Sequence, residues 1–515
     1  MSLEKVPKAA WAAAGVVVLL IVVGAVVLLA GGSSSSGEEL EFTGSGHPGV
    51  DLANTRQVSG PIDSSNVSTL EEAWALPAIG QGTYGSFAAT PIISKGVIYN
   101  QDLESNVQAI ALDSGEVLWT KKYLDPSHGP NGVVVADGHV FGATATEAFA
   151  LDQETGKEVW SVPLTRNGSE SIDMAPGYNS GKLFISTVPV TASETYGGGA
   201  VGVFWALDGK TGKKLWHFDT VPKTLWGNPK INSGGGLWYP PSFDGKGSVY
   251  IAVGNPGPLP GDAKFPWASS RPGPNLYADS VVKLDEETGK KDWHYQQTPH
   301  NIYDWDFQNP PVLLNAGGKE LAIGSGKSGI VVALDAKTGK PVWKQLVGRH
   351  NGHDNDGLYA MRGEYSKIKL GEVFPGALGG IIAPLASDGS TLYVPIVNHS
   401  MTLVSGSEIS ESSAATGEVV ALDAATGKFK WKKELAAPAY GAPTVVNDLV
   451  FATTSEGIVT ALDKNSGGEI WQASLPAGTN VGAMANGEYL IAPAGLPLAE
   501  GQEAQIVAFK LGGEG

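Results

Sequence analysis

A short motif recurs along this chain and constrains its fold more than any other feature. Each copy has a strand ending in Ala-Leu-Asp or a close variant, a polar turn such as Glu-Thr-Gly-Lys, and a second strand with a tryptophan. An Asp at this place accepts hydrogen bonds from turn amides, and the Gly supplies a positive φ. We expect each Trp to fill a slot between neighbouring sheets. The seven copies carry Trp119, Trp160, Trp216, Trp293, Trp343, Trp431 and Trp471.

The spacing of the copies indicates the fold class. Plain copies lie about 40 residues apart, which is typical of four-stranded β-propeller blades, and the longer gaps indicate insertions. The chain end, QIVAFKL, reads as a strand that lacks its Trp partner, and the start, LEEAWALP with Trp74, supplies that partner. Pairing the two ends would close the ring without an exposed edge. The sequence therefore predicts an all-β, eight-bladed β-propeller, with seven blades as the alternative.

Composition excludes several classes of protein. The 69 Gly and 32 Pro residues favour many short strands and turns. A net charge of −17 argues against a nucleic-acid partner, which requires clustered Lys and Arg. The chain has no cysteine, so disulfides, thiolate catalysis and a CxxCH haem site are ruled out.

The N-terminus predicts a membrane anchor. Residues 9–30 are uncharged and largely apolar over about 20 positions, long enough to span a bilayer. Lys5 and Lys8 precede this stretch, which places residues 1–8 in the cytoplasm and the propeller on the extracytoplasmic, periplasmic or extracellular, side. The alternative is a cleaved signal peptide, whose apolar stretch is usually shorter. Residues 31–48 read as a flexible linker, and residues 49–515 as the propeller.

The repeat, together with the opening HPGVDLANTRQVSGPIDSSNVSTLEEAW and the segment SFAATPIISKGVIY, resembles the quinoprotein alcohol dehydrogenases. That resemblance covers the chain from about Gly49 to its end. It implies a propeller that binds pyrroloquinoline quinone (PQQ) and a calcium or lanthanide ion. The repeat alone is shared with non-enzymatic propellers, including outer-membrane assembly scaffolds.

The segment QTPHNIYDWDFQNPP, residues 297–311, interrupts the repeat and resembles the part of the family that carries the catalytic aspartate. By this resemblance Asp304 is the base, and Asp306 is an additional metal ligand of lanthanide-using members. Alternation along an extended chain would place the two carboxylates on one side. Hard oxygen ligands suit Ca²⁺ or a lanthanide. The alternative is that both aspartates only cap a turn.

Three other positions match the family in the same register. Trp238, in NSGGGLWYPPS, falls on the aromatic residue beneath the quinone plane, and Asn255, in the GNPG turn, on a metal-binding amide. Lys327, in GSGKSG, falls on the cation beside the quinone oxygens. Taken singly, each has an ordinary alternative: a packing Trp, a turn Asn and a solvated Lys.

The chain also departs from the family pattern. Asn131 stands where the family has a pocket Arg, Asp173 where it has a Thr, and Ile381 where it has an Asn. Strict spacing puts the metal-binding Glu at Gly197, and Glu194 lies three residues earlier. The adjacent-cysteine disulfide of the family cannot form. Loss of the Arg predicts weaker binding of the PQQ carboxylates.

One further insertion, VGRHNGHDNDGLY, gathers Arg349, His350, His353, Asp354 and Asp356. A cation-binding loop, a wall of a substrate funnel and a solvated loop all remain possible interpretations, and the solvated loop is the most common outcome for such a run.

Two hypotheses about function follow. The first is a membrane-anchored quinoprotein dehydrogenase that oxidises an alcohol, aldehyde or sugar, with Asp304 as base and Asp306, Asn255, Asp304 and Glu194 around the metal. Its electrons would pass to a separate cytochrome or to the membrane quinone pool, because the chain has no haem motif. The second is a propeller that serves as a cell-envelope scaffold, since a fold does not by itself fix a function.

Overall fold

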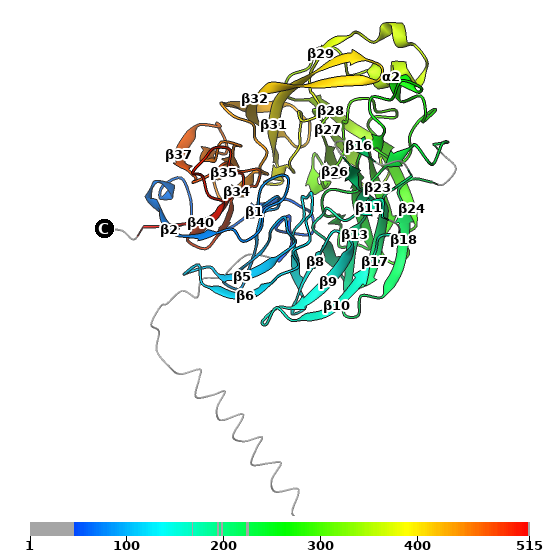
Figure 1. The fold of residues 1–515 in the computed structure, drawn as a ribbon. Coiled ribbons are helices and arrows are strands. Elements are labelled where there is room, and N and C mark those ends of the chain that lie inside the picture. The colour runs from blue at the N-terminus through cyan, green and yellow to red at the C-terminus, as the bar shows by residue number, and fades with distance from the viewer. Residues whose placement is uncertain (1–45, 167, 193–194, 197–198, 223–225, 513–515) are drawn as a thin grey trace, which may run out of the picture. The chain divides into compact units, whose positions relative to one another are not determined.

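The computed structural model describes residues 46–166, 168–192, 195–196, 199–222 and 226–512. These residues are almost entirely strands and turns (Figure 1). No helix among them is long and apolar enough to cross a membrane. The predicted cytoplasmic tip, the anchor at residues 9–30 and nearly all of the predicted linker lie outside the described residues.

Among the described residues, eight sheets have four or five strands each. The first contains β3 (Ile92–Ser94), β4 (Val97–Gln101), β5 (Val107–Ala111) and β6 (Val117–Lys121), and the second β7 (Val134–Ala136), β8 (His139–Ala143), β9 (Glu147–Asp152) and β10 (Glu158–Pro163). The third contains β12 (Gly177–Asn179), β13 (Lys182–Ser186), β17 (Val203–Asp208) and β18 (Lys214–Asp219), and the fourth β20 (Ser242–Phe243), β21 (Ser248–Val253), β23 (Ser280–Asp285) and β24 (Lys291–Gln296). The fifth contains β25 (Val312–Ala316), β26 (Lys319–Ser325), β27 (Ile330–Asp335) and β28 (Pro341–Leu346).

The last three sheets include the two longest strands and the first and last strands of the described residues. The sixth contains β29 (Gly371–Val373), β30 (Ala386–Ser387), β31 (Thr391–Ser405), β32 (Glu408–Asp423) and β33 (Phe429–Leu435). The seventh contains β1 (Gln57–Val58), β34 (Thr444–Val446), β35 (Leu449–Thr453), β36 (Ile458–Asp463) and β37 (Glu469–Ser474). The eighth contains β38 (Met484–Asn486), β39 (Tyr489–Ala494), β40 (Gln505–Leu511) and β2 (Leu70–Pro77).

Short elements fill the connections. Three two-stranded ladders join β11 (Glu170–Ser171) to β14 (Val188–Pro189), β15 (Thr191–Ala192) to β16 (Thr195–Tyr196), and β19 (Ser233–Gly234) to β22 (Pro256–Gly257). The helical turns are η1 (Val67–Thr69), η2 (Pro266–Ala268), α2 (Asp356–Met361) and η3 (Tyr365–Lys367).

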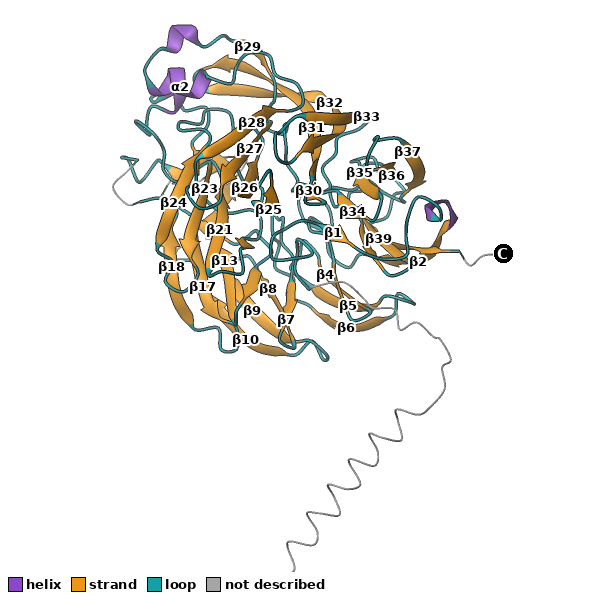
Figure 2. Cartoon of the chain, turned by 180° about the vertical axis from the view of Figure 1, so that it is seen from behind, coloured by secondary structure: helices purple, strands orange, loops and turns teal. Residues whose placement is uncertain are grey.

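The sheets follow one another around a common centre in chain order, as the colours show in Figure 1 and, from behind, in Figure 2. The predicted pairing of the two chain ends is present: β2 pairs with β40 in antiparallel register from Leu70↔Leu511 to Pro77↔Gln505. This ladder covers what would otherwise be two open sheet edges.

A tryptophan and a glycine make the contact between successive sheets. The Trp of one sheet lies against the Gly in the turn of the next, so closely that a methyl group on that Gly would lie under 3 Å from the ring. The same indole N–H donates to a carbonyl of that next sheet, as Trp293 does to Ala336 at 3.1 Å. The predicted slot for Trp is therefore confirmed. The pairs in the described residues are Trp74–Gly115, Trp119–Gly156, Trp160–Gly212, Trp216–Gly289, Trp293–Gly339, Trp343–Gly427 and Trp431–Gly467.

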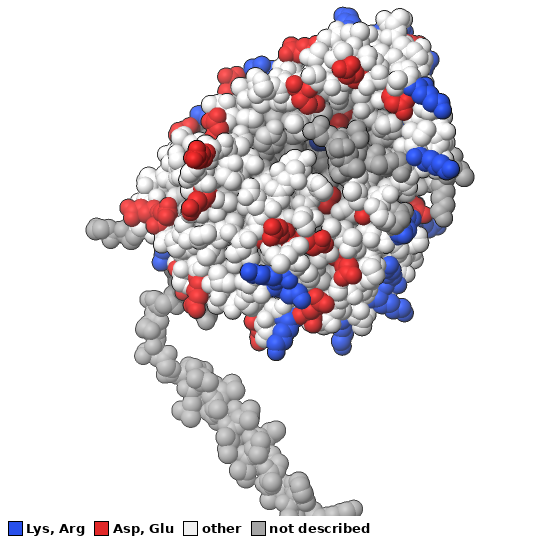
Figure 3. All heavy atoms as spheres, viewed as in Figure 1, with Lys and Arg blue, Asp and Glu red and all other residues white. Residues whose placement is uncertain are grey.

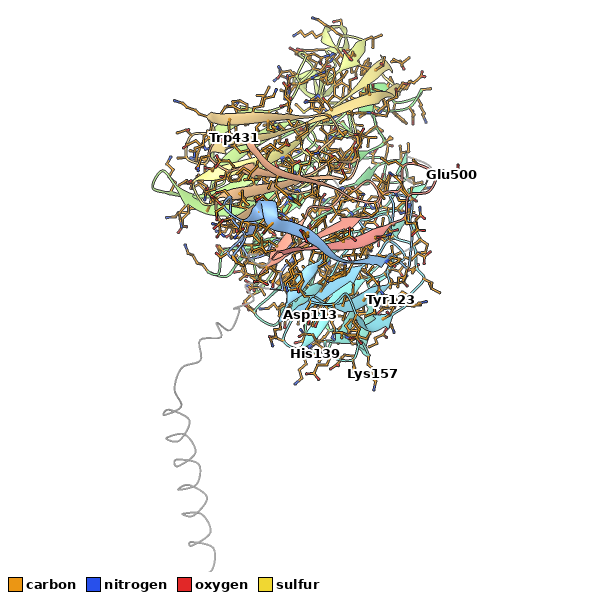
Figure 4. All side chains as sticks on the ribbon, turned by 90° about the vertical axis from the view of Figure 1, so that its left-hand side faces the viewer. Asp113, Tyr123, His139, Lys157, Trp431 and Glu500 are labelled. Carbon is orange, nitrogen blue, oxygen red and sulfur yellow. The ribbon has the colours of Figure 1, made fainter. Side chains whose placement is uncertain are left out.

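The repeat Asp shapes its turn, as predicted. Asp152 Oδ1 accepts hydrogen bonds from both the amide (2.9 Å) and the hydroxyl (2.6 Å) of Thr155. The hydroxyl bond, with the amide bond, lowers the pKa of the exposed Asp152 carboxyl. Figure 4 shows His139 and Lys157 at the outer edge, near these turns. Charged side chains of both signs are interspersed over the face shown in Figure 3.

The opening segment, residues 46–58, lies against several sheets rather than one. Its backbone carbonyls accept hydrogen bonds from amides of the second, fourth, fifth, sixth and seventh sheets. The bonds are Val135 N to Gly46 O, Phe243 N to Leu52 O, Leu313 N to Ala53 O, Ser387 N to Thr55 O and Val445 N to Arg56 O, at 2.7–3.0 Å. A segment that touches so many sheets must lie near their common centre.

Candidate active site

The segment of residues 297–311 connects β24 to β25 and is held by Asn301. The Asn301 side-chain oxygen accepts hydrogen bonds from the amides of Tyr303 (2.9 Å) and Trp305 (3.3 Å). The Trp305 indole donates to Pro375 O at 3.1 Å, and its ring is buried. Asp304 lies between these two anchored amides with φ +60°, which is uncommon for a residue other than Gly. The loop is thus fixed on both sides of the candidate base.

Asp304 and Asp306 share one cation. Lys327 Nζ, from the turn between β26 and β27, lies 2.9 Å from Asp304 Oδ2 and 2.7 Å from Asp306 Oδ2. Both carboxylates therefore reach the same ammonium, although Asp304, with φ +60°, lacks the extended conformation from which this convergence was expected.

Asn255 and Trp238 complete the cluster. The Asn255 side chain donates to Asp304 Oδ1 at 2.6 Å, and its backbone amide donates to Asp306 Oδ1 at 2.7 Å. The Trp238 indole also donates to Asp306 Oδ1, at 3.2 Å. Five residues from four segments of the sequence therefore meet at one place, and every oxygen of the two carboxylates has a donor.

The electrostatics suit proton transfer at Asp304. Burial raises the pKa of this carboxyl to about 7, with Lys327 opposing the rise and Asp306 adding to it. The Asp304 side chain is nevertheless 27% exposed, so a small molecule can reach it. Burial disfavours the Lys327 charge, but Asp304 and Asp306 outweigh it and raise the ammonium pKa. A base whose pKa lies near neutrality is well matched to abstracting a hydroxyl proton.

Behind the loop lies a polar network that the repeat pattern gave no means to predict. Asn301 Nδ2 donates to Asp279 Oδ2 at 3.0 Å, and Arg271 Nη2 donates to Asn301 O at 3.0 Å. Arg271 and Asp279 are both fully buried. Burial, with Asp306 nearby, raises the pKa of Asp279 well above its usual range. Of these residues only Asn301 falls in the segment that the sequence singled out.

Family models match most of the folded body. A model of the glucose/ethanol/alcohol dehydrogenase β-propeller domain matches residues 175–349, which include all five clustered residues. A model described as outer membrane protein assembly factor BamB matches residues 84–237 and 364–512, more than half of the chain. The chain belongs to the quinoprotein alcohol dehydrogenase-like β-propeller family.

Relatives within this family are distant but cover most of the chain. The quinohemoprotein alcohol dehydrogenase of Comamonas testosteroni is 27% identical over 84% of this chain and 69% of its own length. The lanthanide-dependent methanol dehydrogenase of Methylorubrum extorquens is 28% identical over 83% of this chain and 82% of its own. The crystal structure of the Comamonas enzyme superposes with a TM-score of 0.76 at 23% identity, covering 92% of this chain and 81% of that one. This likeness establishes the β-propeller fold.

This propeller departs from its family's polar pocket at three places. Asn131 donates to Asp102 O at 2.7 Å, and its own side-chain oxygen has no partner among the described residues. Asp173 is buried, and burial raises its pKa to about 6 although His128 opposes the rise. Ile381 is fully buried in a core cluster of the fifth and sixth sheets, so its side chain supplies packing rather than a polar contact. None of the three supplies a cation.

The predicted metal ligands are brought together only in part. Asn255, Asp304 and Asp306 converge, whereas Glu194 and Gly197 lie outside the described residues. Within the described ranges of the propeller, no three or more His, Asp and Glu side chains form a group that would hold a metal ion.

The histidine-containing insertion is not simply a solvated loop, because two of its charged side chains are buried. His353 and Asp356 are buried and paired at 2.6 Å, and Tyr303, next to Asp304, donates to the same Asp356 oxygen at 2.6 Å. His350 pairs with Asp354 at 2.7 Å, and only Arg349 is well exposed. The interpretation as a solvated loop is therefore wrong for His353 and Asp356. These two residues support the loop that carries Asp304.

Proposed function

We propose that this protein is a PQQ-dependent dehydrogenase that oxidises an alcohol, aldehyde or sugar, with Asp304 as the base. The observation that carries the proposal is the contact of Lys327 with both Asp304 and Asp306, beside Asn255 and Trp238. The alcohol dehydrogenases among its relatives support the same reaction class.

The residues present fit the quinone and a hard cation at this cluster. Asp304 and Asp306 offer carboxylate oxygens, and Asn255 offers an amide oxygen once its side chain turns over. Trp238 offers a flat ring, and Lys327 a positive charge beside the developing negative charge. When bound, PQQ accepts the two electrons that leave the substrate, and Ca²⁺ or a lanthanide polarises it.

The chain's own residues handle the proton. Oxidation of an alcohol to a carbonyl compound releases two electrons and two protons, and Asp304 takes the hydroxyl proton. Its pKa of about 7 leaves a large ionised fraction at neutral pH. Lys327 holds Asp304 and Asp306 by ion pairs, and Asn301 fixes the backbone on both sides of Asp304.

We interpret the eight sheets as eight blades of one ring, which the β2–β40 pairing supports. The apolar residues 9–30 support a single membrane anchor with the propeller on the extracytoplasmic side. Electrons would then pass to a separate cytochrome or to the membrane quinone pool.

A scaffold in the cell envelope is the second candidate function. It is favoured by the loss of polar pocket groups at Asn131 and Ile381, and by the BamB-type model that matches more than half of the chain. In that case the Asp304 cluster would only stabilise the fold.

Turnover separates the two functions. The full-length protein in mild detergent would be loaded with PQQ and either Ca²⁺ or La³⁺, and reduction of an artificial dye would be followed with a panel of alcohols, aldehydes and sugars. The dehydrogenase proposal predicts metal-dependent dye reduction that falls by about 10³-fold or more in Asp304→Asn. No turnover with any substrate or metal, from protein that is folded by circular dichroism, would favour the scaffold.

A further inference from the structure

A cavity of about 60 Å³ lies where the opening segment meets the inner ends of the sheets. Arg56 of that segment lines it, together with Thr90, Asn131, Tyr239 and Tyr440. These residues come from five separated parts of the chain, so the cavity lies near the common centre of the sheets. Neither Asp304 nor Lys327 lines it.

Arg56 is a buried cation whose hydrogen-bond acceptors among the described residues are all neutral. Its Nε donates to Pro443 O at 2.9 Å and Nη1 to Pro48 O at 3.3 Å. Nη2 donates to the hydroxyls of Thr90 at 3.1 Å and Thr444 at 3.4 Å. No carboxylate among the described residues forms an ion pair with this guanidinium, although the residue is only 4% exposed.

A buried guanidinium without a counter-charge is an expensive arrangement. Removing a charge from water is unfavourable even after the protein relaxes, and buried charges are therefore almost always paired. Burial lowers the pKa of Arg56 to about 10, so the group remains charged at neutral pH. The missing counter-charge must therefore come from outside the described side chains.

The cavity offers the space and one further polar group. Its volume of about 60 Å³ is several times the 10–15 Å³ or so that one water molecule needs. The buried Asn131 side chain also lines it, and Asn131 Oδ1 has no hydrogen-bond partner among the described residues. An anion beside Arg56 leaves room for a water molecule that donates to Asn131 Oδ1.

We propose that this cavity is an anion site in which Arg56 binds one small monovalent anion, such as chloride, formate or a carboxylate group. The cavity includes Asn131, which stands at a pocket position of the family, but Arg56 needs a counter-charge whether or not a quinone binds at Asp304. The anion site and the proposed function can therefore fail independently. The carboxylate has two possible sources, a free anion or an arm of the quinone cofactor, and the chemistry of recognition is the same for both.

Thermal unfolding of the full-length, cofactor-free protein tests the site. The protein would be titrated with sodium formate or chloride at constant ionic strength, with sodium gluconate as the balancing salt because its anion is too large for the cavity. A specific site predicts a saturable rise in Tm of about 2–4 °C for the small anions. Identical Tm values in formate, chloride and gluconate would overturn the proposal and leave a cavity that holds only water.

Two variants and one control sharpen the test. Asn131→Asp places a carboxylate in the cavity, and we expect it to abolish the dependence of Tm on small anions. Arg56→Gln should abolish it as well; if that variant does not fold, Asn131→Asp still decides. Asn355→Asp adds the same charge at an exposed position and should keep the full anion response. An unchanged response in Asn131→Asp would contradict the assignment of the site.

A second titration distinguishes the two sources of the carboxylate. PQQ binding, followed by tryptophan quenching, would be measured at low and high formate concentration. Competition would show that an arm of the quinone occupies the Arg56 site, and independence would show that the site binds a free anion. A protein that binds no PQQ at all but responds to formate would refute the proposed function and retain the anion site.

Discussion

Lys327 Nζ lies 2.9 Å from Asp304 Oδ2, so the candidate base exists as one half of an ion pair in a largely buried setting. The pair resolves a conflict at Asp304. Burial alone would keep this carboxyl protonated and useless as a base, and the ammonium returns its pKa towards neutrality.

Replacing Lys327 by Met should raise the pKa of Asp304 further. The ammonium is the largest influence that lowers this pKa, and a neutral side chain cannot replace it. In metal-free protein we expect the protonation midpoint to rise from about 7 by 1 unit or more. The carboxylic acid band in the infrared spectrum, assigned with Asp304→Asn, would report the midpoint. Lys340→Met, at an exposed turn, should leave it unchanged, and a midpoint that fell in Lys327→Met would contradict this account.

Replacing Asn301 by Ala should loosen the loop around Asp304. The change removes the acceptor of the Tyr303 and Trp305 amides and the donor to Asp279. Because all of these groups are buried, we expect a loss of about 2–4 kcal/mol in the free energy of unfolding. Urea unfolding followed by circular dichroism would measure it. A loss below about 0.5 kcal/mol, the size of an ordinary surface substitution, would mean that Asn301 does not hold the loop.

The contact between Gly339 and Trp293 predicts a steric effect that a matched glycine lacks. A methyl group on Gly339 would lie 2.6 Å from the Trp293 ring, whereas on Gly318 it would meet nothing within 4 Å. Both glycines have positive φ, +68° and +74°, so both changes to Ala carry a left-handed penalty of about 1 kcal/mol. We expect Gly339→Ala to lower the free energy of unfolding by about 1–3 kcal/mol more than Gly318→Ala does, because the added methyl group overpacks against the Trp293 ring. Equal losses of unfolding free energy in the two variants would argue against the close contact.

Asp173 predicts a specific dependence of stability on pH. Its pKa is raised by burial from 3.8 to about 6 in the folded protein. Because the folded protein holds this proton more tightly than the unfolded chain does, the group stabilises the fold fully at pH values below the pKa of the unfolded chain. This contribution to the free energy of unfolding is lost as the pH rises through about 6. The free energy of unfolding of the wild-type protein should therefore fall by roughly 2–3 kcal/mol between pH 4 and pH 7 because of this group. Asp173→Asn should not show this loss, and parallel stability curves for the two proteins would contradict the assignment.

Much of the fold could be predicted from the sequence because the repeat is local. The Asp–Thr turn, the Gly and the Trp lie within about a dozen residues of one another, and each contact joins one copy to the next. The pairing of Leu70–Pro77 with Gln505–Leu511 was predictable for a different reason, since each end lacked the strand that the other supplies.

The candidate site was predictable only where a resemblance pointed to it. Asp304, Asp306 and Lys327 fell on a family motif, and the structure brings them together. Asp279 and Arg271 do not lie in any motif that the sequence analysis identified. Their role depends on contacts with Asn301 that only the folded chain makes. The importance of Arg56 likewise depends on the burial of its guanidinium, which a sequence pattern does not show.

The central claim is that Asp304 and Asp306 hold a hard cation beside a bound quinone. Its most direct test is a titration of the full-length protein with PQQ in La³⁺, in Ca²⁺ and in chelator, followed by quenching of tryptophan fluorescence. A metal and quinone site at these aspartates predicts saturable PQQ binding that requires the metal and weakens by about 10-fold or more in Asp306→Ala. Binding that is equally tight in chelator and in Asp306→Ala, or no binding by the folded protein under any of these conditions, would contradict it.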